Sequence, residues 1–148
     1  MDDPKAKLQA ALKEAMLKKD NARRDVIRLL TSAIKQVEID TRKDLTPEDV
    51  IGILQKEAKK RRETIEEAEK AGRMEMAASE KQELVIIEEF LPQQLSREEI
   101  TVLAREAIAQ TGVTSAKEMG KIMGALQPKV KGKADGKLVS EVVRELLS

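Results

Sequence analysis

The chain has 148 residues, enough for one domain or for two small domains sharing a core, and it contains no Cys, His, Trp or Tyr. Without Cys and His it cannot hold a disulfide, a thiolate nucleophile, a Cys-based metal centre or a His-containing catalytic triad. Charged residues make up 37% of the sequence but the net charge is only +1, which is typical of long exposed helix faces and argues against disorder.

Residues 1–91 carry start and stop signals for four helices. Asp3-Pro4 supplies an N-cap and a proline at the first helical position. Thr46-Pro47-Glu48-Asp49 does the same, with acids in the first turn where the helix dipole favours them. Gly72 is a suitable end for the third helix, and Pro92 follows the fourth. Together with apolar residues at helical spacing, these signals predict helices over about residues 4–16, 21–37, 47–71 and 74–90.

The segment Leu91-Pro92-Gln93-Gln94-Leu95 is the best candidate for a boundary. Pro92 pushes the residue before it away from helical angles, and no charge interrupts the segment. We therefore expect an all-α, multihelical fold with an N-terminal helical bundle over residues 1–91 and a smaller subdomain over residues 92–148.

Three further helices are predicted beyond this boundary. Ser96-Arg97-Glu98-Glu99 and Ser115-Ala116-Lys117-Glu118 both have the pattern of a capping box, in which Ser and Glu each satisfy a free amide of the first turn. Gly112 should end the first of these helices, and Pro128 should follow the second. Asp135 should cap the last helix, giving three helices in the C-terminal subdomain.

Positive charge is concentrated between Lys117 and Lys137. Six lysines stand there against Glu118 and Asp135, a net charge of +4, whereas residues 1–90 hold 19 basic and 20 acidic side chains. The segment also holds four of the seven glycines. Lysines on a glycine-punctuated loop suit phosphate contacts, which position a nucleic acid without reading its sequence. The alternative is a solvated loop in which Gly120 and Gly124 let two helices pack closely, and spacing alone favours that alternative.

A second charged segment, Lys59-Lys60-Arg61-Arg62, precedes a run of glutamates. Its side chains point around most of a helical turn, so we expect an exposed, salt-bridged face. The i,i+4 pairs Lys59–Glu63, Arg62–Glu66 and Glu66–Lys70 would contribute about 0.2–0.5 kcal/mol each. The adjacent glutamates at 66–67 and 88–89 diverge by about 100° on a helix, so neither pair forms a dyad. No metal or cofactor site is predicted.

The chain resembles the YqeY family over nearly its whole length. The resemblance is carried by 119–126 (MGKIMGAL) and 128–137 (PKVKGKADGK), and also by 26–30, 60–66 and 91–95. The family's C-terminal part is similar to the tail of the B subunit of the glutamine-dependent aspartyl/glutamyl-tRNA amidotransferase, which contacts the outer corner of tRNA. The resemblance implies a tRNA-binding, amidotransferase-related module. The family also carries the label of a carbon–nitrogen ligase with glutamine as amido-N-donor.

The resemblance and the charge pattern together define the predicted site. No catalytic residue is predicted, because the chain resembles only the tail of the amidotransferase subunit and lacks the usual nucleophiles and bases, so we do not expect it to perform amidation alone. The predicted RNA-binding residues are Lys121, Lys129, Lys131, Lys133 and Lys137, with Gly120, Gly124, Gly132 and Gly136.

Two kinds of partner fit these features. The first is tRNA; the alternative is a protein, with the chain acting as a helical protein–protein interaction adaptor without an RNA role. DNA is not expected as a partner. No apolar run approaches the roughly 20 residues of a membrane span, and the acidic start lacks the features of a secretory signal. We therefore expect no membrane partner and a cytoplasmic location.

Overall fold

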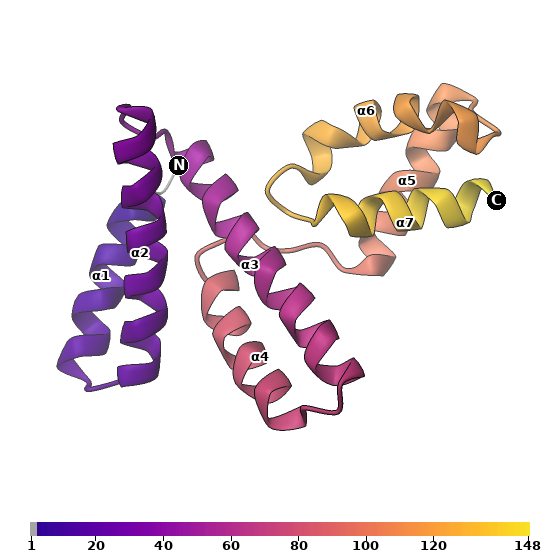
Figure 1. Ribbon diagram of the computed structural model, residues 1–148. Coiled ribbons are helices and arrows are strands. Elements are labelled where there is room, and N and C mark those ends of the chain that lie inside the picture. The colour runs from indigo at the N-terminus through magenta and orange to yellow at the C-terminus, as the bar shows by residue number, and fades with distance from the viewer. Residues whose placement is uncertain (1–2) are drawn as a thin grey trace. The chain divides into compact units, whose positions relative to one another are not determined.

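The structure is a computed structural model that describes residues 3–148, so Met1 and Asp2 of the acidic start lie outside the described residues. Seven α-helices and one short 3₁₀ helix account for most of the described chain, which contains no strand (Figure 1). The all-α, multihelical fold predicted from the sequence is confirmed. The helices are α1 (Pro4–Leu17), α2 (Asn21–Thr41), α3 (Pro47–Lys70), α4 (Met74–Glu88), α5 (Arg97–Thr111), η1 (Ala116–Glu118), α6 (Met119–Val130) and α7 (Gly136–Leu147).

The chain divides into two compact units, with the division after Pro92. We call residues 3–92 the N-terminal unit and residues 93–148 the C-terminal unit. Each unit has its own cluster of buried apolar side chains. A Leu or Ile fully buried in such a cluster contributes about 1.5–3 kcal/mol relative to an exposed one.

The N-terminal unit contains two antiparallel helix pairs, α1 with α2 and α3 with α4 (Figure 1). Their starts follow the predicted caps. Asp3 accepts the N–H of Lys5 at 3.1 Å, and Thr46 and Asp49 form a reciprocal capping box at 3.2 and 3.0 Å. Gly72 follows α3 with φ +74°, a left-handed conformation that favours glycine. The core consists of Leu8, Ala15, Val26, Ile27, Leu30, Ile34, Val50, Leu54, Ala58, Ile87, Phe90 and Leu91.

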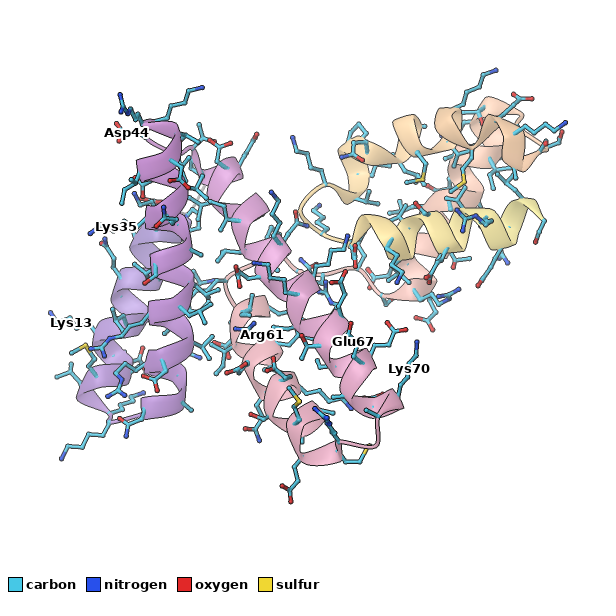
Figure 2. All side chains as sticks on the ribbon, in the orientation of Figure 1. Lys13, Lys35, Asp44, Arg61, Glu67 and Lys70 are labelled. Carbon is cyan, nitrogen blue, oxygen red and sulfur yellow. The ribbon has the colours of Figure 1, made fainter. Side chains whose placement is uncertain are left out.

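The arginines of α3 do not all lie on the solvated face that we expected. The side chain of Arg61 is only 15% exposed, and its Nε lies 3.3 Å from Glu80 and 3.1 Å from Glu83 of α4 (Figure 2). Arg62 also reaches α4, where its guanidinium lies 3.7 Å from Glu88. The prediction of an exposed face is therefore wrong for Arg61, because local spacing could not show that α4 would bring carboxylates opposite this residue.

Two other ion pairs predicted for α3 have opposite outcomes. Glu66 and Lys70 lie 3.1 Å apart as predicted, whereas Lys59 and Glu63 do not pair within the described chain. Lys60 instead contacts Glu57 at 3.4 Å, one turn earlier on the helix. The side chain of Glu57 is only 11% exposed, so this contact keeps a charge close to a largely buried carboxylate.

The C-terminal unit packs α5, α6 and α7 around a core of Ile100, Ala104, Ala107, Val113, Ile122, Leu126, Val130, Val139, Val142 and Val143. The capping box at Ser96 is confirmed: Ser96 Oγ accepts the N–H of Glu99 at 3.1 Å, and Glu99 accepts the N–H of Ser96 at 3.2 Å. Gly112 ends α5 with φ +71°. Asp135 caps α7 by accepting the N–H of Lys137 at 3.1 Å.

Two predictions about α6 are wrong. Ser115 caps the 3₁₀ turn η1 rather than α6, and Glu118 does not complete a capping box but pairs with Lys121 at 3.2 Å. Pro128 lies inside α6 instead of following it. Pro128 has no N–H, so the carbonyl of Gly124 loses its i+4 donor. Gly124 is exposed, which lets water take the place of that donor and lets the helix continue to Val130.

Candidate RNA-binding surface

The turn between α6 and α7 gathers most of the predicted lysines. We call residues 129–137 the lysine turn; Figure 1 shows it where the colour passes from orange to yellow. Lys129 stands in the last turn of α6, Lys131 and Lys133 lie in the connection, and Lys137 is in the first turn of α7. All four side chains are exposed. Nine consecutive residues thus present four ammonium groups to solvent.

These ammonium groups are not neutralised within the described chain. Of the five predicted lysines, only Lys121 has a carboxylate within ion-pair distance among residues 3–148, that of Glu118 at 3.2 Å. The one acid in the turn, Asp135, uses its carboxylate to cap α7. The charges of Lys129, Lys131, Lys133 and Lys137 therefore remain available to an external anion.

The conformation of the turn is set by Gly132. This residue is buried and has φ +78°, in the left-handed region that favours glycine. On either side of it, the carbonyl of Val130 accepts the N–H groups of Lys133 at 2.9 Å and Ala134 at 3.1 Å. Gly132 thus determines the backbone conformation of the turn from a buried position. The other three predicted glycines are exposed.

The turn is also held by the segment that precedes α5. The side-chain Nε2 of Gln94 donates to the carbonyl of Gly132 at 3.0 Å, and the N–H of Leu95 donates to the carbonyl of Lys133 at 2.8 Å. In the sequence, residues 91–95 indicated a boundary and part of the family resemblance, but no contact with the lysine turn. No local pattern links Gln94 to a residue 38 positions later, so this contact could not be predicted.

Gly120 and Gly124 lie on an exposed face of α6, beside Lys121. A Cβ added at either glycine would meet no atom within 4 Å in the described chain. The alternative that these glycines let two helices of this chain pack closely is therefore wrong. Glycine inside a helix costs about 1 kcal/mol relative to alanine, and no packing contact within the described residues offsets that cost at Gly124.

The surface suits contacts with a nucleic-acid backbone rather than with bases. The sequence has a single aromatic residue, Phe90, which is 5% exposed in the N-terminal unit and lies near Lys7 and Arg23. The C-terminal unit therefore has no aromatic platform on which a base could stack. A nucleic acid bound here would have to be recognised by its phosphates and its backbone shape.

Other kinds of site find little support in the described residues. Residues 3–148 bring together no cluster of three or more acidic side chains fit to hold a metal ion. Among the same residues, no helix combines the length and the apolar character that a membrane crossing requires.

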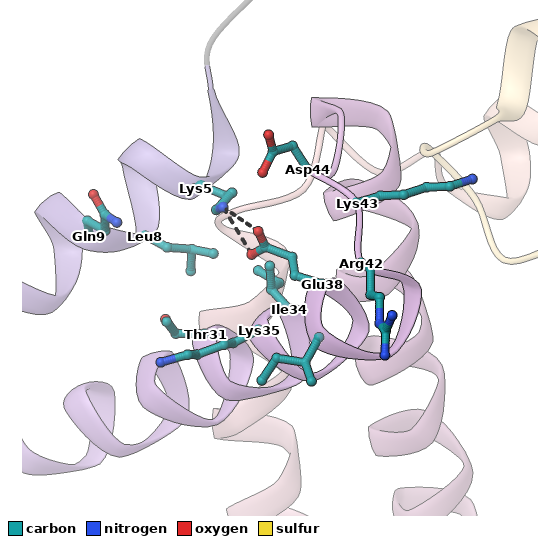
Figure 3. A pocket seen from close by; sticks show the side chains of 11 residues that line it. Lys5, Leu8, Gln9, Thr31, Ile34, Lys35, Glu38, Arg42, Lys43 and Asp44 are labelled. Carbon is teal, nitrogen blue, oxygen red and sulfur yellow. Dashed lines mark hydrogen bonds and ion pairs between the residues drawn. The ribbon is translucent and has the colours of Figure 1, made fainter.

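A pocket of about 520 Å³ lies in the N-terminal unit, between α1, α2 and the loop before α3 (Figure 3). Lys5 donates to both carboxylate oxygens of Glu38, at 3.0 and 3.2 Å, above a floor that includes Leu8 and Ile34. In Figure 3, Lys43 points away from this pair. The central pair neutralises itself, and Lys35, Arg42 and Lys43 against Asp44 leave the pocket lining with a net charge of +2, compared with +3 for the lysine turn.

Three relatives in yeasts match part of the chain, and each is named "Altered inheritance of mitochondria protein 41, mitochondrial". The protein of Lachancea thermotolerans is 38% identical over 92 residues, 62% of this chain and 49% of that protein. The match in Vanderwaltozyma polyspora is 36% identical over 57% of this chain and 46% of that protein. In Kluyveromyces lactis it is 38% identical over 64% of this chain and 53% of that protein. The chain thus spans about half the length of these relatives.

The cytoplasmic location expected from the sequence is contradicted by these relatives, since all three are named as mitochondrial proteins. The expectation rested on the lack of a secretory signal and of a long apolar run. Neither feature distinguishes the cytoplasm from the interior of a mitochondrion.

A protein-family comparison covers almost the entire chain. Residues 5–147 match the family described as "Yqey-like protein", a range that includes all seven α-helices except Pro4 of α1. The resemblance inferred from the glycine- and lysine-rich block is confirmed by this match. The chain belongs to the YqeY family.

Proposed function

We propose that the chain binds folded RNA through the lysine turn and the exposed face of α6, and that tRNA is the class of RNA it binds. The observation that carries the proposal is the set of four exposed ammonium groups in nine residues with no carboxylate partner in the described chain. The similarity of the family's C-terminal part to a tRNA-contacting tail supports tRNA. With no aromatic residue in the C-terminal unit, the ligand is recognised by its phosphates and its shape.

The number of lysines sets the expected salt dependence. Each phosphate neutralised by a lysine contributes about −0.9 to the slope of log K against log salt on a duplex, and about −0.7 on a single strand. Four contacts give a slope of roughly −3 to −3.6, which is about a hundredfold loss of affinity between 50 and 200 mM salt.

The test is charge reversal with a matched control. Lys129→Glu, Lys131→Glu and Lys133→Glu combined should abolish most tRNA binding, measured by titrating labelled tRNA at several salt concentrations. The control combines three exposed lysines of the N-terminal unit that lack a carboxylate partner in the described chain, as Lys43→Glu, Lys56→Glu and Lys59→Glu. It changes the net charge equally and should bind nearly as the unchanged chain does. Binding that resists both salt and the first triple change would refute the proposal.

The proposal gives the chain a binding role and leaves the carbon–nitrogen ligase chemistry of the family label to another protein. The unchanged chain should release no ammonia from glutamine and should not amidate misacylated tRNA. Turnover by the purified chain alone would show that this division of roles is wrong.

A second candidate, a protein-interaction adaptor, is favoured by one observation on α1. Met16 and Leu17 are 51% and 76% exposed, and with Leu12 they line a hollow of about 470 Å³. Exposed apolar side chains of this kind mark protein contacts when they are contiguous. A partner that stays bound after nuclease treatment and is lost in Leu17→Ser would support this function over RNA binding.

A further inference from the structure

Only some of the backbone groups of the lysine turn form hydrogen bonds within the turn itself. Its N–H groups at Lys133 and Ala134 both point to the carbonyl of Val130. The carbonyls of Gly132 and Lys133 are instead satisfied from outside the turn, by the side chain of Gln94 and the backbone of Leu95. Two consecutive residues therefore clamp two consecutive carbonyls, at 3.0 and 2.8 Å.

The contact from Gln94 acts where the turn is most constrained. Gly132 is buried and left-handed, and a buried carbonyl that lacks a donor is strongly disfavoured. Donation from Gln94 therefore favours one orientation of the peptide plane that joins Gly132 to Lys133. That plane lies between Lys131 and Lys133 and, with the neighbouring bond from Leu95, fixes the orientation of one residue relative to the other.

We propose that Gln94 is a positioning residue for the RNA-binding surface: it holds the lysine turn in the conformation in which its lysines reach one ligand together. The inference rests on the proposed function, since it concerns the same surface. Its physical basis is preorganisation, because a turn that is already ordered loses less conformational freedom when it binds. Gln94 itself need not touch the RNA.

The test compares two neighbouring glutamines. Gln94→Met keeps the size of the side chain and removes the donor. Gln93→Met is the matched control, because Gln93 is exposed and makes no hydrogen bond in the described chain. The first readout is hydrogen exchange at the amide of Leu95, which donates to Lys133. We expect faster exchange in Gln94→Met and unchanged exchange in Gln93→Met.

The second readout is tRNA affinity as a function of salt. Gln94→Met should weaken binding about two- to tenfold. It should also make the salt slope shallower by about one unit, because fewer lysines engage at once. Partial unfolding would lower the amount of active protein but would leave the slope of the folded molecules unchanged. The slope therefore separates positioning from a loss of stability.

The possible results distinguish the two proposals. Faster exchange with an unchanged affinity and slope would refute the positioning role while the proposed function stands. Unchanged exchange in Gln94→Met would also refute it, because the turn would then be held without Gln94. If the unchanged chain shows no salt-dependent tRNA binding, the proposed function fails and the positioning role fails with it. In that case the exchange at Leu95 still shows whether Gln94 holds the turn.

Discussion

Replacing Gly124 by alanine should make the protein more stable and its binding weaker. Gly124 is the sixth residue of the 12-residue helix α6, it is exposed, and an added Cβ meets no atom within 4 Å. Alanine is favoured over glycine inside a helix by about 0.8–1.0 kcal/mol. Gly124→Ala should therefore raise the free energy of unfolding by up to about 1 kcal/mol, which is a four- to fivefold larger folding equilibrium constant.

The expected effect on binding has the opposite sign. If a phosphate backbone approaches α6 beside Lys121, a methyl group at residue 124 stands in its way and lowers the affinity. If the face of Gly124 makes no contact with RNA, Gly124→Ala should raise the stability of the protein and leave its RNA affinity unchanged. The pair of measurements therefore separates a helix effect from a binding effect.

Gly52→Ala is the matched control for this experiment. Gly52 is also the sixth residue of its helix, α3, and an added Cβ there also meets nothing within 4 Å. It should stabilise the N-terminal unit and leave RNA binding unchanged.

Unfolding in urea should be followed by far-ultraviolet circular dichroism, since the chain has no Trp or Tyr. Destabilisation by Gly124→Ala would show that this face of α6 is not open. An affinity equal to that of the unchanged chain would refute the contact of RNA with the glycine face.

Two further changes test the packing of each unit. Burial, followed by the charge of Glu83, raises the pKa of Glu80 above its ordinary value of 4.5 in spite of Arg61. The folded state therefore favours protonated Glu80. The stability gained from this protonation is fully present below about pH 4.5 and is lost as the pH rises through the raised pKa. Glu80→Gln should remove that loss, so urea midpoints measured across this range should depend less on pH; an unchanged dependence would contradict the cause assigned. Ser96→Ala removes the capping box of α5 and should cost about 1 kcal/mol in urea unfolding, whereas Ser115→Ala, at a short 3₁₀ turn, should cost less.

The helices were predictable where their signals are local. Thr46 with Asp49, Ser96 with Glu99, and Asp135 with the N–H of Lys137 all act within three residues, so residue type and spacing were enough to place these starts. The same kind of signal failed at Ser115, because the chain tightens there into a 3₁₀ turn and Glu118 finds Lys121 instead. Local patterns therefore placed the helices but not every cap.

The residues of the candidate site remain a prediction from the sequence, whereas their geometry depends on the fold. The cluster of lysines is visible in the sequence, but whether each ammonium group has a carboxylate partner depends on side chains from other helices. Arg61 shows the same limit, because its partners Glu80 and Glu83 lie on α4. The hydrogen bond from Gln94 to Gly132 joins residues 38 positions apart, and only the fold brings them together.

If RNA binds this face of α6, the proline inside the helix would help to distinguish ribose from deoxyribose. Pro128 has no N–H, so the carbonyl of Gly124, three residues after Lys121, lacks its helical donor. A ribose 2′-hydroxyl can donate a hydrogen bond to that oxygen, and DNA has no such group. We therefore expect a DNA hairpin of the same sequence and charge to bind more weakly than its RNA counterpart.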